Sequence, residues 1–160
     1  MNRIFEFTGA KKIVFGKGSF GRLPEIIKQK GAKRPFFVMD HNLAKSGYSE
    51  RLGKMLEAEG LKYEIFDRVV AEPELELADK AAKLAARGKC DLVAGFGGGS
   101  AMDLAKAVAA LVANKAQAVD FLGLNKVPGP GLPTVMIPTT AGTGSEVTFT
   151  AVFVRKDLAK

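Results

Sequence analysis

The sequence predicts an α/β fold in which a parallel sheet carries helices on both of its faces. Short apolar runs alternate along the chain with segments in which apolar residues recur every three or four positions. That alternation is typical of repeated strand–helix–strand units. The chain has 160 residues, of which 47% are hydrophobic, so a single domain over 1–160 is long enough to bury a core.

The first half of the chain is expected to begin with a hairpin and to continue into alternating helices and strands. A Thr-Gly-Ala turn separates the first two apolar runs, which predicts the hairpin. Gly31 and Gly60 close the two helical patterns, since glycine commonly ends a helix. The expected strands are 4–7, 12–15, 35–39 and 61–66, and the expected helices are 20–27 and 48–56.

The second half repeats the alternation around a central apolar strand. One helical pattern precedes Gly88, and another follows the glycine-rich turn after the central strand. A loop rich in Pro and Gly over 127–133 separates this second helix from the last two apolar runs. The expected strands are 92–96, 134–137 and 147–154, and the expected helices are 75–85 and 101–112, with a short turn or helix at 121–122.

The glycine-rich turn, Gly95 to Ser100, is the first candidate ligand site. It has the spacing G-x-G-x-x-S, one residue different from the dinucleotide-binding fingerprint G-x-G-x-x-G/A. Glycines between a strand and a helix let backbone N–H groups approach a ligand, and a helix N-terminus favours a phosphate or pyrophosphate. The alternative is a tight structural turn, in which Ser100 and Asp103 form a capping box.

Asp40 ends the first predicted parallel strand and is the second candidate. A carboxylate at this place can accept both ribose hydroxyls of an adenosine, and it would repel a 2′-phosphate. The alternative is an N-cap or Asx-turn residue that starts the Asp-His-Asn turn. The local sequence fits both interpretations.

The third candidate is a loop rich in threonine and glycine, Pro138 to Glu146, which follows the strand expected at 134–137. Hydroxyl side chains and backbone amides at a strand end suit a phosphate or a nicotinamide. Ligands of parallel sheets bind beyond the carboxyl ends of the strands. We therefore expect this loop to converge with Asp40, the glycine-rich turn and the region 70–73. The hydroxyl side chains before Glu146 are Thr139, Thr140, Thr143 and Ser145.

Composition argues against several other classes of protein. The formal net charge is +7, but Lys and Arg are dispersed, so we expect no nucleic-acid partner. No apolar window has the length of a membrane span, and the single cysteine, Cys90, allows no disulfide within the chain. We therefore expect a cytoplasmic protein with no membrane partner. The lone His41 and Cys90 provide no metal-ligand pair, and neither a G-x-S-x-G nor a P-loop motif occurs.

On these motifs the chain resembles the iron-containing, metal-dependent (group III) alcohol dehydrogenases, relatives of glycerol dehydrogenase and dehydroquinate synthase. GGGSAMDLAK at 97–106 matches the family pattern GGGS-x-x-D-x-A-K, and PTTAGTGSEVT at 138–148 matches a second family pattern. The resemblance implies a Rossmann-like dinucleotide domain of the dehydroquinate synthase type. It also implies hydride transfer between a small alcohol or aldehyde and a nicotinamide cofactor, in a homo-oligomer.

The resemblance also implies roles for particular residues. It implies that Asp40 favours NAD over NADP, and that Asp103 and Lys106 support the glycine-rich turn, Asp103 as its cap. No catalytic residue and no metal ligand is assigned to this chain. The implied cofactor-binding residues are Asp40 at the adenosine ribose, Gly97, Gly98, Gly99 and Ser100 at the pyrophosphate, and Thr139, Thr140, Thr143 and Thr148 along the phosphates and the nicotinamide ribose.

In this family an all-helical C-terminal domain supplies an aspartate and three histidines to Fe²⁺ or another divalent metal, which polarises the alcohol oxygen. The sequence 1–160 ends before these ligands. We therefore expect a truncated chain that binds cofactor without turnover when it is alone. Two alternatives stay open: a glycerol dehydrogenase-like or dehydroquinate synthase-like domain, and a non-catalytic nucleotide-binding or assembly module.

Overall fold

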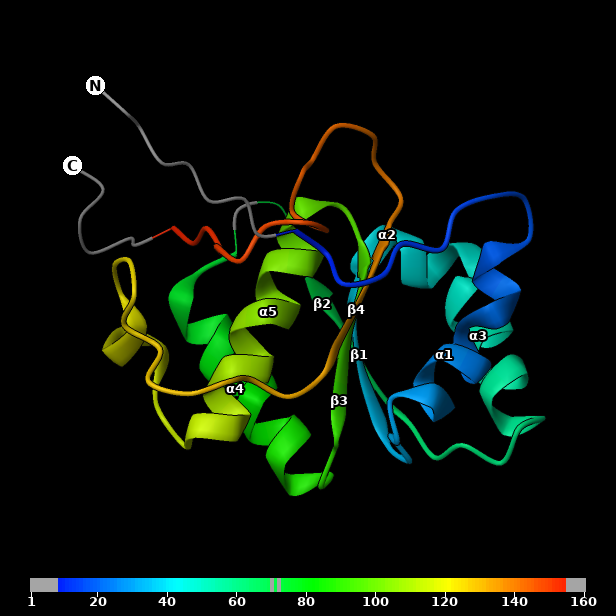
Figure 1. Ribbon diagram of the computed structural model, residues 1–160, viewed down its shortest axis with the longest axis horizontal. Coiled ribbons are helices and arrows are strands. Elements are labelled where there is room, and N and C mark those ends of the chain that lie inside the picture. The colour runs from blue at the N-terminus through cyan, green and yellow to red at the C-terminus, as the bar shows by residue number, and fades with distance from the viewer. Residues whose placement is uncertain (1–8, 70, 72, 155–160) are drawn as a thin grey trace, which may run out of the picture.

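The computed structural model describes residues 9–69, 71 and 73–154. Four parallel strands in the order β2-β1-β3-β4 form the central sheet, and helices cover both of its faces (Figure 1). This arrangement confirms the predicted fold class. The elements are η1 (Ser19–Arg22), α1 (Leu23–Gln29), β1 (Pro35–Asp40), α2 (His41–Leu43), η2 (Ala44–Tyr48), α3 (Ser49–Glu57), β2 (Glu64–Val69), α4 (Leu75–Arg87), β3 (Leu92–Gly97), α5 (Gly99–Asn114), η3 (Ala118–Phe121) and β4 (Thr134–Pro138).

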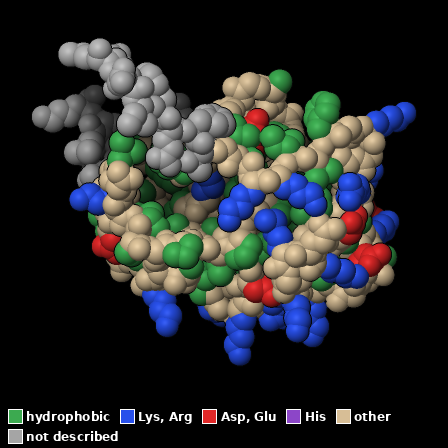
Figure 2. All heavy atoms as spheres, in the orientation of Figure 1, with side chains coloured by type: hydrophobic (Ala, Val, Ile, Leu, Met, Phe, Trp, Pro, Cys, Tyr) green, Lys and Arg blue, Asp and Glu red, His purple; other side chains and the backbone are tan. Residues whose placement is uncertain are grey.

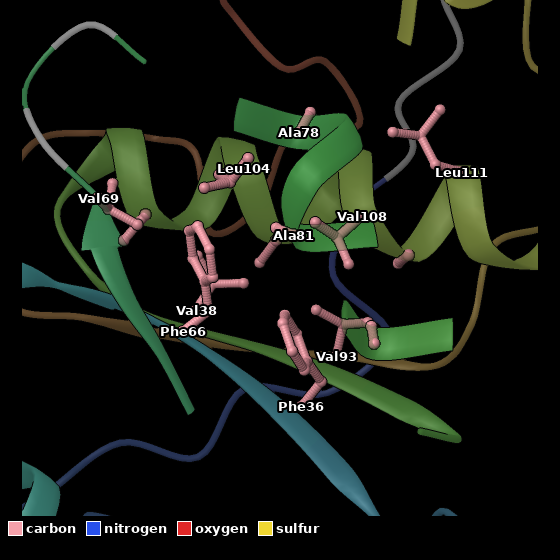
Figure 3. Packing of buried hydrophobic residues seen from close by; sticks show 14 of the residues in the cluster. Phe36, Val38, Phe66, Val69, Ala78, Ala81, Val93, Leu104, Val108 and Leu111 are labelled. Carbon is pink, nitrogen blue, oxygen red and sulfur yellow. The ribbon is translucent and has the colours of Figure 1, made fainter. Parts of the chain in front are cut away.

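Two apolar cores lie on the two faces of the sheet. On β1, Phe36 and Val38 pack with α4 and α5, whereas Phe37 and Met39 pack with α1 and α3. The alternation follows from strand geometry, in which successive side chains point to opposite faces. Figure 3 shows the first core, where side chains of β1, β2 and β3 point toward the two helices. Both central strands are therefore buried on both sides, as is typical of parallel sheets.

Helix α5 lies directly against β3 because Gly95 has no side chain. A Cβ atom on Gly95 would lie 2.8 Å from the Cα atom of Met102 and 3.0 Å from the Cβ atom of Ala105. A larger residue would separate the helix from the strand. Gly95 therefore determines how closely α5, and the turn at its N-terminus, approach the sheet.

The strand register brings the ends of all four strands to one edge of the sheet. Phe96 of β3 lies opposite Met39 of β1 and opposite Ile137 of β4, and Asp40 pairs with Val69 of β2. Because the strands are parallel, the segments that follow them leave the sheet together. In Figure 1 the loop after β4, in orange, rises beside the N-terminal end of α5.

Two predicted strands are wrong. Residues 12–15 form no strand, because no described segment pairs with them; the other half of the predicted hairpin, 4–7, lies outside the described residues. Residues 147–154 form only an isolated parallel bridge between Val154 and Glu74. Their backbone is held by side chains of α5 instead of a neighbouring strand.

The remaining predicted elements are confirmed, with small shifts of their ends. The strand expected at 61–66 begins at Glu64 and continues to Val69, and the short helix expected at 121–122 is η3. The helix expected at 48–56 is α3, preceded by the irregular turn η2, where Gly47 adopts a positive φ. None of the helices in the described part of the chain is long and apolar enough to cross a membrane.

Candidate functional site

A cavity of about 320 Å³ lies at the carboxyl edge of the sheet, between the segments that leave β1, β2 and β3. The sheet order changes direction between β1 and β3, and such switch points are where α/β sheets bind ligands. The structure thus brings together Asp40 and the glycine-rich turn, as the sequence predicts. The lining residues are Asp40, His41, Asn42, Val69, Ala71, Gly98, Gly99 and Ser100.

The glycine-rich turn passes close to Asp40 because Gly97 has no side chain. Gly97 has φ +151°, in the region that side-chain-bearing residues rarely adopt. A Cβ atom there would lie 3.0 Å from the Cβ atom of Ala101 and 3.1 Å from that of Asp40. The turn can therefore connect β3 to α5 beside Asp40 only with glycine at this position.

The N-terminus of α5 opens toward the cavity without a side-chain cap. Gly98 is the N-cap residue, and the first turn contains no acidic residue. The first hydrogen bond of the helix runs from the Met102 N–H to the Gly98 carbonyl, at 3.2 Å. The N–H groups of the first turn have no partner within the helix, and together with the helix dipole they favour an anion such as a phosphate.

The predicted capping box of Ser100 and Asp103 is wrong. The Asp103 carboxylate lies against the segment after β4, which in the structure continues as a loop over 139–150 and which we call the threonine-rich loop. Its Oδ1 accepts a hydrogen bond from Ser145 Oγ at 2.6 Å. Its Oδ2 accepts from the Val152 N–H at 3.0 Å. A capping aspartate would instead have bonded the backbone at the helix start. Asp103 therefore supports the loop after β4, and the N–H groups of the glycine-rich turn are left to a ligand.

Asp40 caps the turn that follows β1. Its Oδ1 accepts hydrogen bonds from the N–H groups of Asn42 and Leu43, at 2.9 Å and 3.3 Å. The N-cap interpretation is therefore confirmed for this oxygen. Asp40 is only half-buried and also lines the cavity, so its second oxygen, Oδ2, can accept a hydroxyl group of a ligand. The two interpretations of Asp40 are compatible.

The threonine-rich loop packs against the glycine-rich turn from the side of β4. The Thr139 N–H donates to the Gly97 carbonyl at 2.9 Å. A Cβ atom on Gly98 would lie 3.3 Å from Thr140 Oγ1. Backbone and hydroxyl groups of this loop are thus beside the N-terminus of α5, and the expected convergence of the two loops is observed.

Thr143 lies beside Gly99 and is oriented by a carboxylate. A Cβ atom on Gly99 would lie 3.8 Å from Thr143 Cβ, and Thr143 Oγ1 donates to Glu146 Oε2 at 2.5 Å. This hydrogen bond is the main reason that the pKa of Glu146 is lowered from its ordinary value. Because the Thr143 O–H donates to Glu146, the Thr143 oxygen is left to accept a hydrogen bond from a ligand.

None of the predicted threonines Thr139, Thr140, Thr143 and Thr148 lines the cavity. The first three lie beside the glycine-rich turn, whereas Thr148 contacts Lys106. Lys106 Nζ donates to Thr148 Oγ1 at 3.3 Å. Lys106 contacts the threonine-rich loop and forms an ion pair with Asp103. Lys106 therefore supports this loop and does not contact the glycine-rich turn.

Several lining residues were missed by the sequence analysis. His41 is exposed but borders the cavity, and its Nδ1 lies 3.2 Å from the Asp67 carbonyl oxygen. Asn42 and Val69 border it as well. Their position directly after or at a strand end is the signal that could have identified them. Of the region 70–73, Ala71 lines the cavity, while residues 70 and 72 lie outside the described part.

Other polar features of the described residues lie away from this edge. A wider hollow of about 770 Å³ lies between α1 and α3, and its charged groups pair with one another, as Lys28 does with Glu59 at 2.6 Å. Cys90 is buried before β3, and burial raises the pKa of its thiol to about 11. Figure 2 shows Lys and Arg side chains spread over the visible face without a continuous basic patch.

Comparisons with known proteins agree with this architecture. A family model described as iron-containing alcohol dehydrogenase matches residues 10–160. Sulfoacetaldehyde reductase of Bilophila wadsworthia is 37% identical over 138 residues, which cover 86% of this chain and 36% of the relative. Long-chain-alcohol dehydrogenase 1 of Geobacillus thermodenitrificans is 42% identical over 136 residues, which cover 83% of this chain and 34% of the relative.

A solved structure gives the same result for the fold. The crystal structure of sulfoacetaldehyde reductase from Bifidobacterium kashiwanohense in complex with NAD⁺ matches with a TM-score of 0.89 and 31% identity, covering 99% of this chain and 42% of that chain. The chain thus spans about a third of the length of the curated relatives it matches. On the family match and these similarities, the chain belongs to the iron-containing alcohol dehydrogenase family.

Proposed function

We propose that residues 1–160 form the dinucleotide-binding domain of an NAD-dependent, metal-dependent alcohol dehydrogenase. The observation that supports this most directly is that Asp40 and the uncapped N-terminus of α5 line the same cavity. A ribose bound by a carboxylate and a pyrophosphate bound at a helix N-terminus are the two anchors of a dinucleotide in such folds. The NAD⁺ complex of the Bifidobacterium relative supports the choice of cofactor.

The residues of this chain would bind and orient the cofactor. Backbone N–H groups of Gly99 and Ser100 would donate to the pyrophosphate, and Gly97 and Gly98 would let it approach. Thr139 and Thr140, which lie beside the glycine-rich turn, would extend this surface toward the nicotinamide ribose. Further along the loop, Thr143 would contribute an acceptor and Thr148 would act through its contact with Lys106. The bound nicotinamide supplies the hydride acceptor.

The geometry of Asp40 favours NAD over NADP. Its charge would repel a 2′-phosphate, and it already occupies the N–H groups of Asn42 and Leu43. Those amides are therefore not available as donors to the additional phosphate. A ribose 2′-hydroxyl, in contrast, can donate to the remaining carboxylate oxygen.

Other parts of the proposal follow from family membership. We propose a small alcohol or aldehyde as the substrate, a cytoplasmic location and a homo-oligomeric enzyme. Exposed apolar side chains such as Phe15 and Phe149, 98% and 80% exposed, suit contacts with further protein. For the divalent metal, the described residues provide no group of three or more His, Cys, Asp or Glu side chains, so we assign it no ligand here and route no step through it.

The test is a titration of the chain into NADH, followed by the fluorescence anisotropy of the cofactor. The chain contains no Trp, so the background from the protein is low. We expect saturable binding to the wild type, and loss of binding in Gly98→Val, whose side chain would meet Thr140 and fill the approach to α5. The matched control is Gly21→Val, because a Cβ atom at Gly21 faces open space. Undiminished binding by Gly98→Val would contradict the proposed site.

A further inference from the structure

The ammonium group of Lys106 is surrounded by oxygen atoms of the threonine-rich loop. Its Nζ lies 3.0 Å from the Ser145 carbonyl, 3.4 Å from the Thr148 carbonyl and 3.3 Å from Thr148 Oγ1. It also donates to the Thr150 carbonyl. On its own helix it lies 2.8 Å from Asp103 Oδ1. Three backbone carbonyls, a hydroxyl and a carboxylate therefore converge on one cation.

This ion pair is largely removed from water. The Lys106 and Asp103 side chains are 12% and 14% exposed, in contrast to the surface pair of Lys54 with Glu50, at 74% and 72%. Ion pairs as exposed as the latter contribute little to stability. At Lys106 the loop oxygens replace water around the ammonium, and removing the cation would leave them facing one another without compensation.

We infer that Lys106 is an internal cation around which residues 145–150 fold, and that it acts as a positioning residue for the dinucleotide site. Rings of backbone carbonyls are how proteins coordinate free monovalent cations. Here the cation is tethered to α5, one to two turns after the N-terminus that borders the cavity. Asp103 completes the arrangement, since it binds both Ser145 Oγ and the Val152 N–H.

The position of the loop beside the glycine-rich turn depends on two anchors. Near its start, the Thr139 N–H bonds the Gly97 carbonyl, and at its far end the loop closes around Lys106. Thr140 and Thr143 lie between these anchors, next to Gly98 and Gly99. Without Lys106 the loop keeps its connection to β4 and its two hydrogen bonds to Asp103, but the carbonyls of Ser145, Thr148 and Thr150 lose their common donor on α5. The expected effect of Lys106 on NADH binding rests on the proposed function, whereas its expected effect on the loop does not.

The experiment removes the tethered cation and then returns a free one. In Lys106→Ala, amide hydrogen exchange over 143–152 should accelerate, and NADH affinity should fall about tenfold or more, as for loss of hydrogen bonds to a charged group. Exchange in β1 and β3 should not change. Addition of propylammonium chloride should restore slow exchange and NADH affinity in part, while 1-propanol or sodium chloride at the same concentration should not. Lys54→Met is the control for loss of an exposed lysine, and it should behave as the wild type.

Two results would overturn the inference. The first is that amide exchange of the loop and NADH affinity in Lys106→Ala equal those of the wild type. The second is that amide exchange accelerates throughout the sheet and does not respond to propylammonium. The second result would mean that Lys106 stabilises the domain in general. If the wild type itself fails to bind NADH, the proposed function fails. The exchange of the 143–152 amides, and its response to propylammonium, still decide the role of Lys106.

Discussion

The substitution Asp40→Asn separates the two tasks that the structure permits for Asp40. Asparagine keeps a side-chain oxygen that can accept from the N–H groups of Asn42 and Leu43, as Asp40 Oδ1 does. It replaces the second carboxylate oxygen by an uncharged NH₂ group, which donates and cannot accept. Asp40→Ala removes both. The pair of variants therefore distinguishes the cap from the proposed contact with the ribose.

The expected magnitudes follow from these contacts. Loss of an N-cap side chain lowers stability by about 1 kcal/mol, which corresponds to a Tm about 2–4 °C lower for a domain of this size, and we expect it for Asp40→Ala only. Loss of the charged acceptor should raise the Kd for NADH about tenfold in both variants. Like charges about 4 Å apart repel by about 1 kcal/mol in water and about 4 kcal/mol near a protein surface. NADPH should therefore bind about fivefold more tightly, or better, to both variants.

The assay is the anisotropy titration with NADH and NADPH, combined with thermal unfolding of the same preparations. A ratio of NADPH to NADH affinity that stays at the wild-type value in Asp40→Asn would refute the assignment of Asp40 to the ribose. A Tm for Asp40→Asn as low as that of Asp40→Ala would refute the claim that the cap survives in asparagine.

Three further predictions concern packing and titration. Gly95→Ala should lower the free energy of unfolding by about 1–3 kcal/mol in urea titrations, because its Cβ atom would lie 2.8 Å from Met102 Cα; an unchanged midpoint would contradict the close packing of α5. Because burial raises the pKa of Cys90 to about 11, the unfolded thiol ionises first, so stability should fall as the pH rises from about 9, and Cys90→Ala should flatten this decline. Because the pKa of Glu146 is lowered in the folded state, this carboxylate stabilises the fold at pH values above its unfolded-state pKa. That contribution is lost as the pH falls through its folded-state pKa. Thr143→Val should raise this pKa in a carboxyl NMR titration, and an unshifted titration would show that the Thr143 hydroxyl is not its cause.

Much of the fold could be predicted because its signals are local. Strand β1 is a continuous apolar run, which is typical of a parallel strand buried on both faces. Its neighbouring side chains Phe36 and Phe37 therefore pack on opposite sides of the sheet. Helical spacing of small and apolar residues predicted α4 and α5. The glycine-rich turn was recognisable because Gly97 occupies a conformation that other residues rarely adopt.

The predictions that failed depend on partners distant in the sequence. Residues 147–154 are rich in β-branched residues, but a strand also needs a neighbour, and here the side chains of Asp103 and Lys106 hold this backbone. The spacing of Ser100 and Asp103 fits a capping box whether Asp103 bonds the start of its own helix or a distant loop. Asp103 bonds Ser145 instead, 42 positions away, and no local pattern contains that information.

The order of the main helices and strands from α1 to β4, the turn at the N-terminus of α5 and the resemblance to the family follow from the sequence alone. Backbone propensity, periodicity and glycine conformations act over a few residues, so a local pattern contains them. Contacts in the folded domain determine which oxygen of Asp40 is occupied, which residues line the cavity beside it and how the threonine-rich loop is held. These depend on contacts between segments that only the register of the parallel sheet brings together. A buried ion pair such as Asp103 with Lys106 is stable only where folding supplies its remaining partners.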